Sequence, residues 1–150
     1  MKRIAILALA TAVVLPFSAR AQSKPDFSGT WTMDAAKSDP APQGRGGGGG
    51  GSQTVKQTAT ELSVTTEGRQ GPQTRTYKLD GSDSMNPGRG GAQVKSVAKW
   101  DGSSIVIETT QDMGGQSVTT KEVRKMDGAN MVVETSFNGN SRKVVYTKGM

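Results

Sequence analysis

The stretch Gln93-Val-Lys-Ser-Val-Ala-Lys-Trp-Asp-Gly-Ser-Ser-Ile-Val-Ile107 decides the fold class of this 150-residue chain. The segments on both sides of Asp101-Gly102 alternate with the two-residue period of a β-strand. An Asp-Gly pair between two such segments favours a two-residue type I′ turn, because that turn needs positive φ angles. We therefore expect two antiparallel strands that are joined directly.

The same pattern extends along the chain in both directions. Further turn pairs stand at Asp80-Gly81, Asp127-Gly128 and Asn138-Gly139, and no segment has a clear 3.6-residue period. The sequence thus predicts an all-β antiparallel up-and-down meander of 8–10 strands. Such a sheet hides its edges best by closing, or nearly closing, into a small barrel. An immunoglobulin-like sandwich is the alternative, but it needs a long crossing connection.

Large apolar residues that share one face of these segments form the predicted interior. They are Trp31, Tyr77, Leu79, Ile105, Ile107, Met131, Val133, Phe137 and Val144.

The composition excludes several kinds of chemistry. The chain has 19 Lys and Arg, 13 Asp and Glu, and neither His nor Cys. It therefore has no disulfide, no thiolate zinc site and no His-dependent relay. No two carboxylates stand at a spacing that strands would hold face to face. The oxygen-rich stretch 80–86 lacks the spacing of a calcium loop. We expect no catalytic residue, no metal and no cofactor.

The first 21 residues have the pattern of a secretory signal peptide. Lys2 and Arg3 precede the apolar stretch Ile4–Leu15, and Ala19-Arg-Ala21 offers a cleavage site after Ala21. An uncleaved membrane anchor is the alternative, but the apolar stretch falls short of the roughly 20 residues that span a bilayer. We expect a soluble, exported product, periplasmic or secreted, with no membrane span after cleavage.

The remaining chain is predicted to contain one domain. Residues 22–26 form an N-terminal tail, and residues 27–150 form the β-barrel domain. Residues 35–52 interrupt the strand pattern with a loop that contains the run Gly46–Gly51. Ordering six consecutive glycines is entropically costly, and no side-chain burial offsets that cost. We therefore expect a flexible glycine-rich loop.

Two stretches resemble the calycin group, which comprises the lipocalins and the intracellular fatty-acid-binding proteins. Gly29-Thr-Trp31 looks like the Gly-x-Trp signature of that group, and the run from Tyr77 to Lys148 is similar to the second half of a fatty-acid-binding protein. The opening Phe27-Ser-Gly-Thr-Trp also resembles small exported bacterial lipocalin-like proteins. The resemblance implies a lipocalin-like barrel with Ser82–Asn86 as an additional strand.

The resemblance also indicates where the chain departs from the family. The glycine-rich loop stands where fatty-acid-binding proteins have a two-helix lid. Their last strand carries an Arg-x-Tyr pair that holds the ligand carboxylate. Tyr146 matches this pair, whereas Val144 occupies the arginine position and Arg142 lies two residues earlier on the same face.

Cations and aromatic residues on these faces are the candidate ligand contacts: Arg75, Tyr77, Trp100, Lys121, Arg142 and Tyr146. A buried cation without a partner is costly, so either these faces open to solvent or the cations meet an anion in a cavity. A register error of one residue would move each side chain to the opposite face. Trp100 has an alternative interpretation as a partly exposed cross-strand aromatic.

Three arginines stand among glycines in loops, at Arg45, Arg69 and Arg89. In a ten-stranded meander these loops lie at one end of the barrel, where they would form a basic portal rim that steers an anionic ligand. Three unrelated solvated loops are the alternative. Nucleic acid is not an expected partner, because no aromatic residues interleave with the arginines.

Three functional hypotheses remain. The favoured one is non-catalytic binding of a small, partly apolar and anionic ligand, so that the partner is a hydrophobic or amphipathic small molecule. The alternative is a structural or protein-interaction barrel of the cell envelope with no internal ligand. An enzyme of unknown type is the third. An interior cavity above roughly 300 Å³ would favour binding.

Overall fold

The computed structural model describes residues 23–40, 51–68, 71–88, 91–112 and 114–149. The predicted signal peptide with Ala21, residues 46–50 of the glycine run and the predicted rim residues Arg45, Arg69 and Arg89 lie outside the described residues. Within the described part of the chain, no helix is long and apolar enough to cross a membrane.

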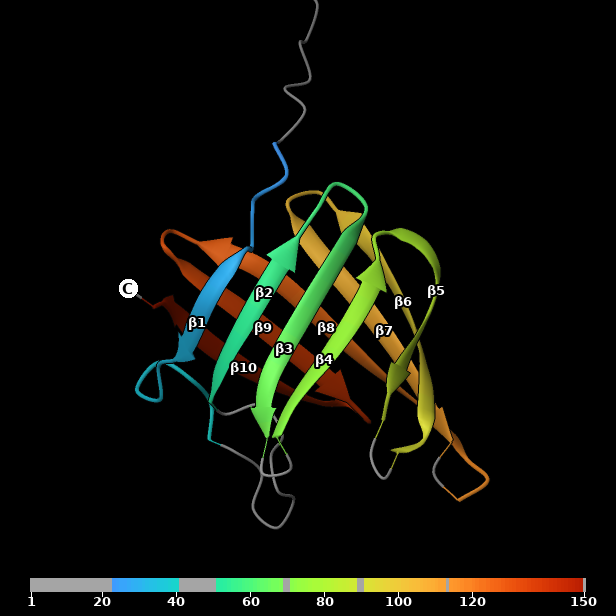
Figure 1. Ribbon diagram of the computed structural model, residues 1–150. Coiled ribbons are helices and arrows are strands. Elements are labelled where there is room, and N and C mark those ends of the chain that lie inside the picture. Colours follow the sequence, from blue (N-terminus) through green and yellow to red (C-terminus); the bar gives the residue numbers. More distant parts are fainter. Residues whose placement is uncertain (1–22, 41–50, 69–70, 89–90, 113, 150) are drawn as a thin grey trace, which may run out of the picture.

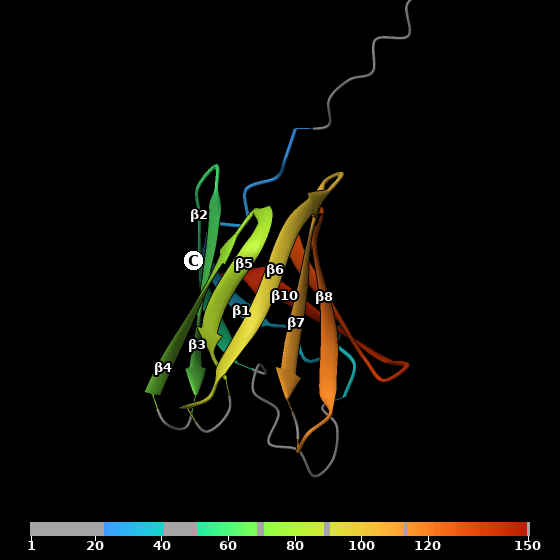
Figure 2. The same ribbon diagram turned by 90° about the vertical axis from the view of Figure 1, so that its right-hand side faces the viewer.

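Ten antiparallel strands form one sheet that curls around a common interior (Figures 1 and 2). They are β1 (Gly29–Met33), β2 (Ser52–Gln57), β3 (Glu61–Gly68), β4 (Gly71–Lys78), β5 (Asp80–Pro87), β6 (Gln93–Asp101), β7 (Ser104–Asp112), β8 (Ser117–Asp127), β9 (Asn130–Phe137) and β10 (Asn140–Lys148). The order in the sheet is β4-β3-β2-β1-β10-β9-β8-β7-β6-β5. This confirms the predicted all-β meander, and β5 contains the additional strand predicted at Ser82–Asn86.

The barrel is nearly closed, with one seam between β4 and β5. These two strands follow each other in the chain but stand at opposite ends of the sheet order, without a backbone ladder between the described residues. Side chains of β5 bridge the gap instead. The Asn86 amide accepts a hydrogen bond from Thr76 N at 2.8 Å and donates one to Thr76 O at 3.0 Å. Ser84 Oγ accepts from Lys78 N at 2.9 Å.

The turns explain part of the register. At Asn138-Gly139 both residues have positive φ, 46° and 78°, as predicted for a type I′ turn. At Asp101-Gly102 and Asp127-Gly128 the predicted hairpins are present, but the predicted type I′ turn is wrong. Each glycine is the first central residue of its turn and alone has positive φ, the pattern of type II′. Asp80-Gly81 is not a hairpin turn, because β4 pairs with β3, and Gly81 lies at an irregularity in β5.

An apolar core fills the end of the barrel where the chain enters β1. Phe27 and Trp31 are fully buried, and Trp31 Nε1 donates to Phe27 O at 2.9 Å. Gln57 holds the segment that precedes β1 against the barrel, because its side chain accepts a hydrogen bond from Phe27 N and donates one to Pro25 O. Eight of the nine predicted interior residues belong to this core. Phe137 is only partly buried, because it ends β9 beside the exposed turn at Asn138.

Gly29 occupies a backbone conformation that favours glycine, at the point where β1 passes the end of β10. Its φ is 138°, and a Cβ there would lie 2.7 Å from Lys148 Cε. Lys148 Nζ in turn stands 5.6 Å from the centre of the Trp31 ring, within the range of a cation–π interaction. The glycine and the tryptophan of Gly29-Thr-Trp31 are therefore linked through one lysine side chain.

β10 is longer than β1. Residues 34–39, which follow β1, cover the part of the β10 edge that β1 does not pair with. Asp34 N donates to Val145 O at 2.8 Å, and Asp39 N donates to Lys143 O at 2.8 Å. Ser38 Oγ accepts from Val145 N at 2.9 Å, and the Asp39 carboxylate accepts from Lys143 N at 2.7 Å. The start of the predicted loop 35–52 is thus held against the sheet.

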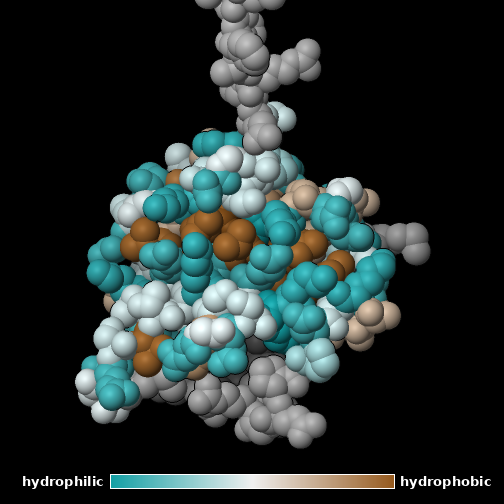
Figure 3. All heavy atoms as spheres, turned by 180° about the vertical axis from the view of Figure 1, so that it is seen from behind, coloured by the Kyte–Doolittle hydropathy of each residue, from teal (hydrophilic) through white to brown (hydrophobic). Residues whose placement is uncertain are grey.

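The outer face of β8–β10 shows small hydrophobic patches between hydrophilic side chains (Figure 3). Val132 and Val145 lie opposite each other and alternate with interior residues, yet both are buried. The residue opposite Val132 on β8 is Lys125, which forms an ion pair with Glu134 at 2.7 Å. Long charged side chains can shield apolar neighbours from water with their aliphatic stems.

Replacing Asn86 with alanine tests the closure of the seam. Asn86→Ala removes two hydrogen bonds and leaves the N–H and C=O of Thr76 without these partners, so we expect a loss of about 2–3 kcal/mol in the free energy of unfolding. Urea unfolding measures this loss. The control is Asn140→Ala at an exposed position, which should change stability by less than about 0.5 kcal/mol. Equal effects of the two substitutions would contradict a stabilising role for the seam.

Candidate functional site

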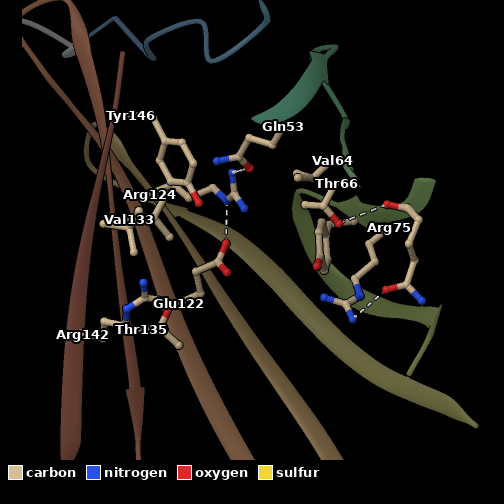
Figure 4. A pocket seen from close by; sticks show the side chains of 13 residues that line it. Gln53, Val64, Thr66, Arg75, Glu122, Arg124, Val133, Thr135, Arg142 and Tyr146 are labelled. Carbon is tan, nitrogen blue, oxygen red and sulfur yellow. Dashed lines mark hydrogen bonds and ion pairs between the residues drawn. The ribbon is translucent and has the colours of Figure 1, made fainter. Parts of the chain in front are cut away.

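The interior holds a cavity of about 200 Å³ beside the apolar core (Figure 4). β2, β3, β4, β8, β9 and β10 supply its lining. The lining residues are Gln53, Val64, Thr66, Gln73, Arg75, Tyr77, Glu122, Arg124, Val133, Thr135, Arg142, Val144 and Tyr146. All except the three valines carry polar groups. The volume is below the roughly 300 Å³ above which we expected a cavity to favour ligand binding, but side chains do not fill the interior completely.

Four of the six predicted ligand contacts meet in this cavity. Arg75 and Tyr77 come from β4, and Arg142 and Tyr146 come from β10. The members of each pair are an even number of residues apart and therefore point to the same side of their strand. The sheet then curls so that these two strands contribute to the same cavity, with β1, β2 and β3 between them in the sheet order.

Trp100 and Lys121 lie elsewhere. Trp100 is partly buried against the core, with its ring centre 6.2 Å from that of Phe27 and Lys24 Nζ 5.1 Å from its ring centre. This position matches the alternative interpretation of Trp100 as a partly exposed aromatic. Lys121 is exposed, because the register of β8 with β7 and β9 turns Glu122 inward, opposite Ile107 and Thr135.

The ion pair of the cavity, in which Arg124 is buried and Glu122 is partly exposed, was not predicted from the sequence. Arg124 is 5% exposed, and its Nε donates to Glu122 Oε1 at 2.5 Å. Its Nη1 donates to Gln53 Oε1 at 3.2 Å. A signal was available, because residues opposite each other in a hairpin share a face. Val133, predicted to be interior, is the partner of Arg124.

Two other arginines of the cavity have no carboxylate partner among the described residues. Arg75 donates to neutral acceptors, to Gln73 Oε1 at 3.2 Å and across the seam to Pro87 O at 3.3 Å. Arg142 Nε is buried without a hydrogen-bond acceptor in the described part of the chain. Glu122 is the one carboxylate in the described lining, and Arg124 engages it. The cavity therefore has an excess of positive charge.

Both tyrosines keep their protons well above neutral pH. Burial raises the pKa of Tyr77 to about 12, and the negative charge of Glu122 acts in the same direction. Burial also raises the pKa of Tyr146 above its usual value. Each phenol is thus a neutral group in the wall of a positively charged cavity. The described residues contain no cluster of three or more carboxylates that could hold a metal ion.

The Tyr77 pKa predicts a specific loss of stability in alkali. A phenol with a pKa of 10 in the unfolded chain and about 12 in the folded chain destabilises the fold only where the unfolded chain has lost the proton. Below pH 10 the fold therefore carries no penalty from this group, and between pH 10 and 12 it loses about 2–3 kcal/mol. Tyr77→Phe should remove this pH dependence, so the difference in unfolding free energy between the two proteins should change across that range. Parallel stability curves would contradict the raised pKa.

The fold has counterparts among solved structures, although neither a scan against protein-family models nor a search of curated proteins gave a match. A point mutant of the fluorescent protein UnaG superposes with a TM-score of 0.64 at 20% identity, over 83% of this chain and 96% of that one. The REP1-NXSQ fatty acid transporter gives 0.59 at 13% identity, over 82% and 96%. A point mutant of this transporter gives 0.63 at 14%, over 81% and 97%. At these identities the likeness concerns the fold, and the chain has a calycin-like β-barrel fold.

Proposed function

We propose that this protein binds a small anionic ligand inside the barrel and does not transform it. The observation that carries the proposal is that Arg75 and Arg142 line one cavity without a carboxylate partner among the described residues. The guanidinium group offers a planar fork of donors that matches a carboxylate. An anion between the two arginines would satisfy the orphaned Nε of Arg142.

The remaining lining supports a ligand with a small apolar part. Val64, Val133 and Val144 are the apolar lining residues, and the rings of Tyr77 and Tyr146 add aromatic surface. Similarity to a fatty acid transporter supports a binding role for this barrel. Glu122 pairs with Arg124 and gives no sign of an acid or base poised for catalysis.

Export completes the proposal. The basic residues Lys2 and Arg3, the apolar stretch Ile4–Leu15 and the small residues around Ala21 support secretion with cleavage after Ala21. The predicted rim residues Arg45, Arg69 and Arg89 stay a prediction. In support of this prediction, β1, β3 and β5 end, and β2, β4 and β6 begin, on the side of the barrel where the β9–β10 turn lies.

Substitution of Arg142 tests the anion site. Arg142→Met keeps most of the side-chain volume but removes the charge, so we expect the affinity for short-chain carboxylates to fall by about tenfold or more. Ligand-induced shifts in melting temperature report on this loss. Native mass spectrometry of the protein purified from its own host should show whether a small molecule co-purifies.

The matched control is Lys121→Met, which removes one positive charge from an exposed position outside the cavity. It should leave carboxylate binding close to that of the unmodified protein. Equal losses in the two variants would mean that the net charge of the protein, and not the cavity, attracts the anion. A folded protein that no carboxylate stabilises would contradict the proposed function.

The mass of the exported protein tests the leader. We expect a mature chain that begins at Gln22, measured by intact-protein mass spectrometry of the envelope fraction or culture medium. An exported chain that still contains Lys2 and Arg3 would contradict cleavage after Ala21.

A further inference from the structure

We infer that the ligand is a compact carboxylic acid with a second oxygen, a hydroxyl or an oxo group, and that Gln53 recognises this second oxygen. The inference rests on the proposed anion site and adds the ligand class to it. It starts from Gln53, a cavity residue that is 4% exposed.

The orientation of the Gln53 amide is fixed by its neighbour. Arg124 Nη1 lies 3.2 Å from Gln53 Oε1, and an arginine can only donate hydrogen bonds. The oxygen of the amide must therefore face Arg124, which leaves Nε2 as a donor on the other side. Figure 4 shows this nitrogen on the side of Tyr146. Among the described residues Nε2 is buried without an acceptor.

A buried donor without an acceptor is rare in native proteins, because it has lost its bonds to water. Gln53 Nε2 and Arg142 Nε are two such donors in the lining of one cavity. They belong to β2 and β10, with β1 between them. Trp31 of β1 pairs with Gln53 on one side and with Lys148 of β10 on the other, and Lys148 lies six residues from Arg142. The two donors thus stand at different places on the wall and require acceptors at two places in the ligand.

The size and lining of the cavity indicate a compact ligand. Its volume of about 200 Å³ is below the roughly 300–1,000 Å³ of pockets for drug-sized molecules. Three valines are its only aliphatic lining among the described residues. The large apolar side chains pack together in the core instead: Phe27, Trp31, Leu62, Ile105, Ile107 and Met131. A long acyl chain would lack both space and apolar contacts.

The test compares each short acid with its oxygenated derivatives. Butanoate, pentanoate and hexanoate are titrated into the full mature protein by calorimetry, together with their oxo and hydroxy derivatives and hexadecanoate. We expect at least one derivative to bind about tenfold or more tightly than its parent acid, because a site built to donate a hydrogen bond discriminates against a ligand without the acceptor. Hexadecanoate should bind more weakly than that derivative.

Gln53→Glu isolates the amide nitrogen. The carboxylate keeps an oxygen for Arg124 and has nearly the same shape, but it replaces the donor with an acceptor. Its charge weakens parent and derivative alike, and an oxo group cannot donate to the new carboxylate, so the affinity ratio of an oxo derivative to its parent acid should fall to about one. The matched control is Gln73→Glu, since Gln73 Oε1 likewise accepts from an arginine in the cavity, Arg75. It introduces the same charge and gives Arg75 a carboxylate partner, so both acids should bind more weakly. The Gln53 donor stays in place, and the preference for the derivative should be retained.

The outcomes separate this inference from the proposed function. If no acid binds to the folded protein, the proposed function fails and the inference fails with it. If parent acids bind and no derivative binds more tightly, or if hexadecanoate binds most tightly, the anion site stands and the inference is overturned. A preference for an oxo derivative that survives Gln53→Glu also overturns the role of Gln53. Should that variant not fold, the ratios measured on the unmodified protein still decide the ligand class.

Discussion

The edge strands of an antiparallel sheet carry backbone N–H and C=O groups that need partners, and the way this protein supplies them shapes its interior. β4 and β5 come together without a ladder, and Asn86 and Ser84 take the place of a strand's own amides. The exposed length of β10 is covered by Ser38 and Asp39 in the same manner. Polar side chains, and not additional apolar packing, join β4 to β5. The sheet therefore encloses an interior although the chain has few apolar residues.

That space is divided between two environments. Phe27 and Trp31 pack with other large apolar residues at one end, where they contribute most of the hydrophobic stabilisation. The rest of the interior is polar, and its most costly member is Arg124, whose buried charge requires both Glu122 and Gln53. A chain with 33% hydrophobic residues, part of them in the predicted leader, cannot fill a ten-stranded barrel with apolar side chains alone. The polar cavity is the remaining part of that interior.

Alternation and turn residues predicted the meander and most of the core, because they are local signals. The additional strand near Ser82 was predicted only through the resemblance to the calycin group. The sequence did not predict that β4 and β5 would remain unpaired. Asp80-Gly81 has the residues of a hairpin turn but lies at an irregularity in β5. Gln53 carried no signal, because its role depends on Arg124, 71 residues away. The inward position of Arg124 was not predicted, although its partner Val133 offered a signal that requires the two strands to be considered together.

Arg75 belongs to both the seam and the cavity, which raises the question of whether a ligand must open the barrel to use it. Its Nε donates to Pro87 O across the seam, and its Nη2 donates to Gln73 Oε1. A guanidinium group has five N–H donors, so these two bonds leave others for an anion. An anion can therefore bind to Arg75 while the seam bond to Pro87 stays intact. Because Arg142 is on β10, far from the seam in the sheet order, the same holds for the opposite side of the cavity. Ligand binding at these two arginines is thus compatible with the closed barrel.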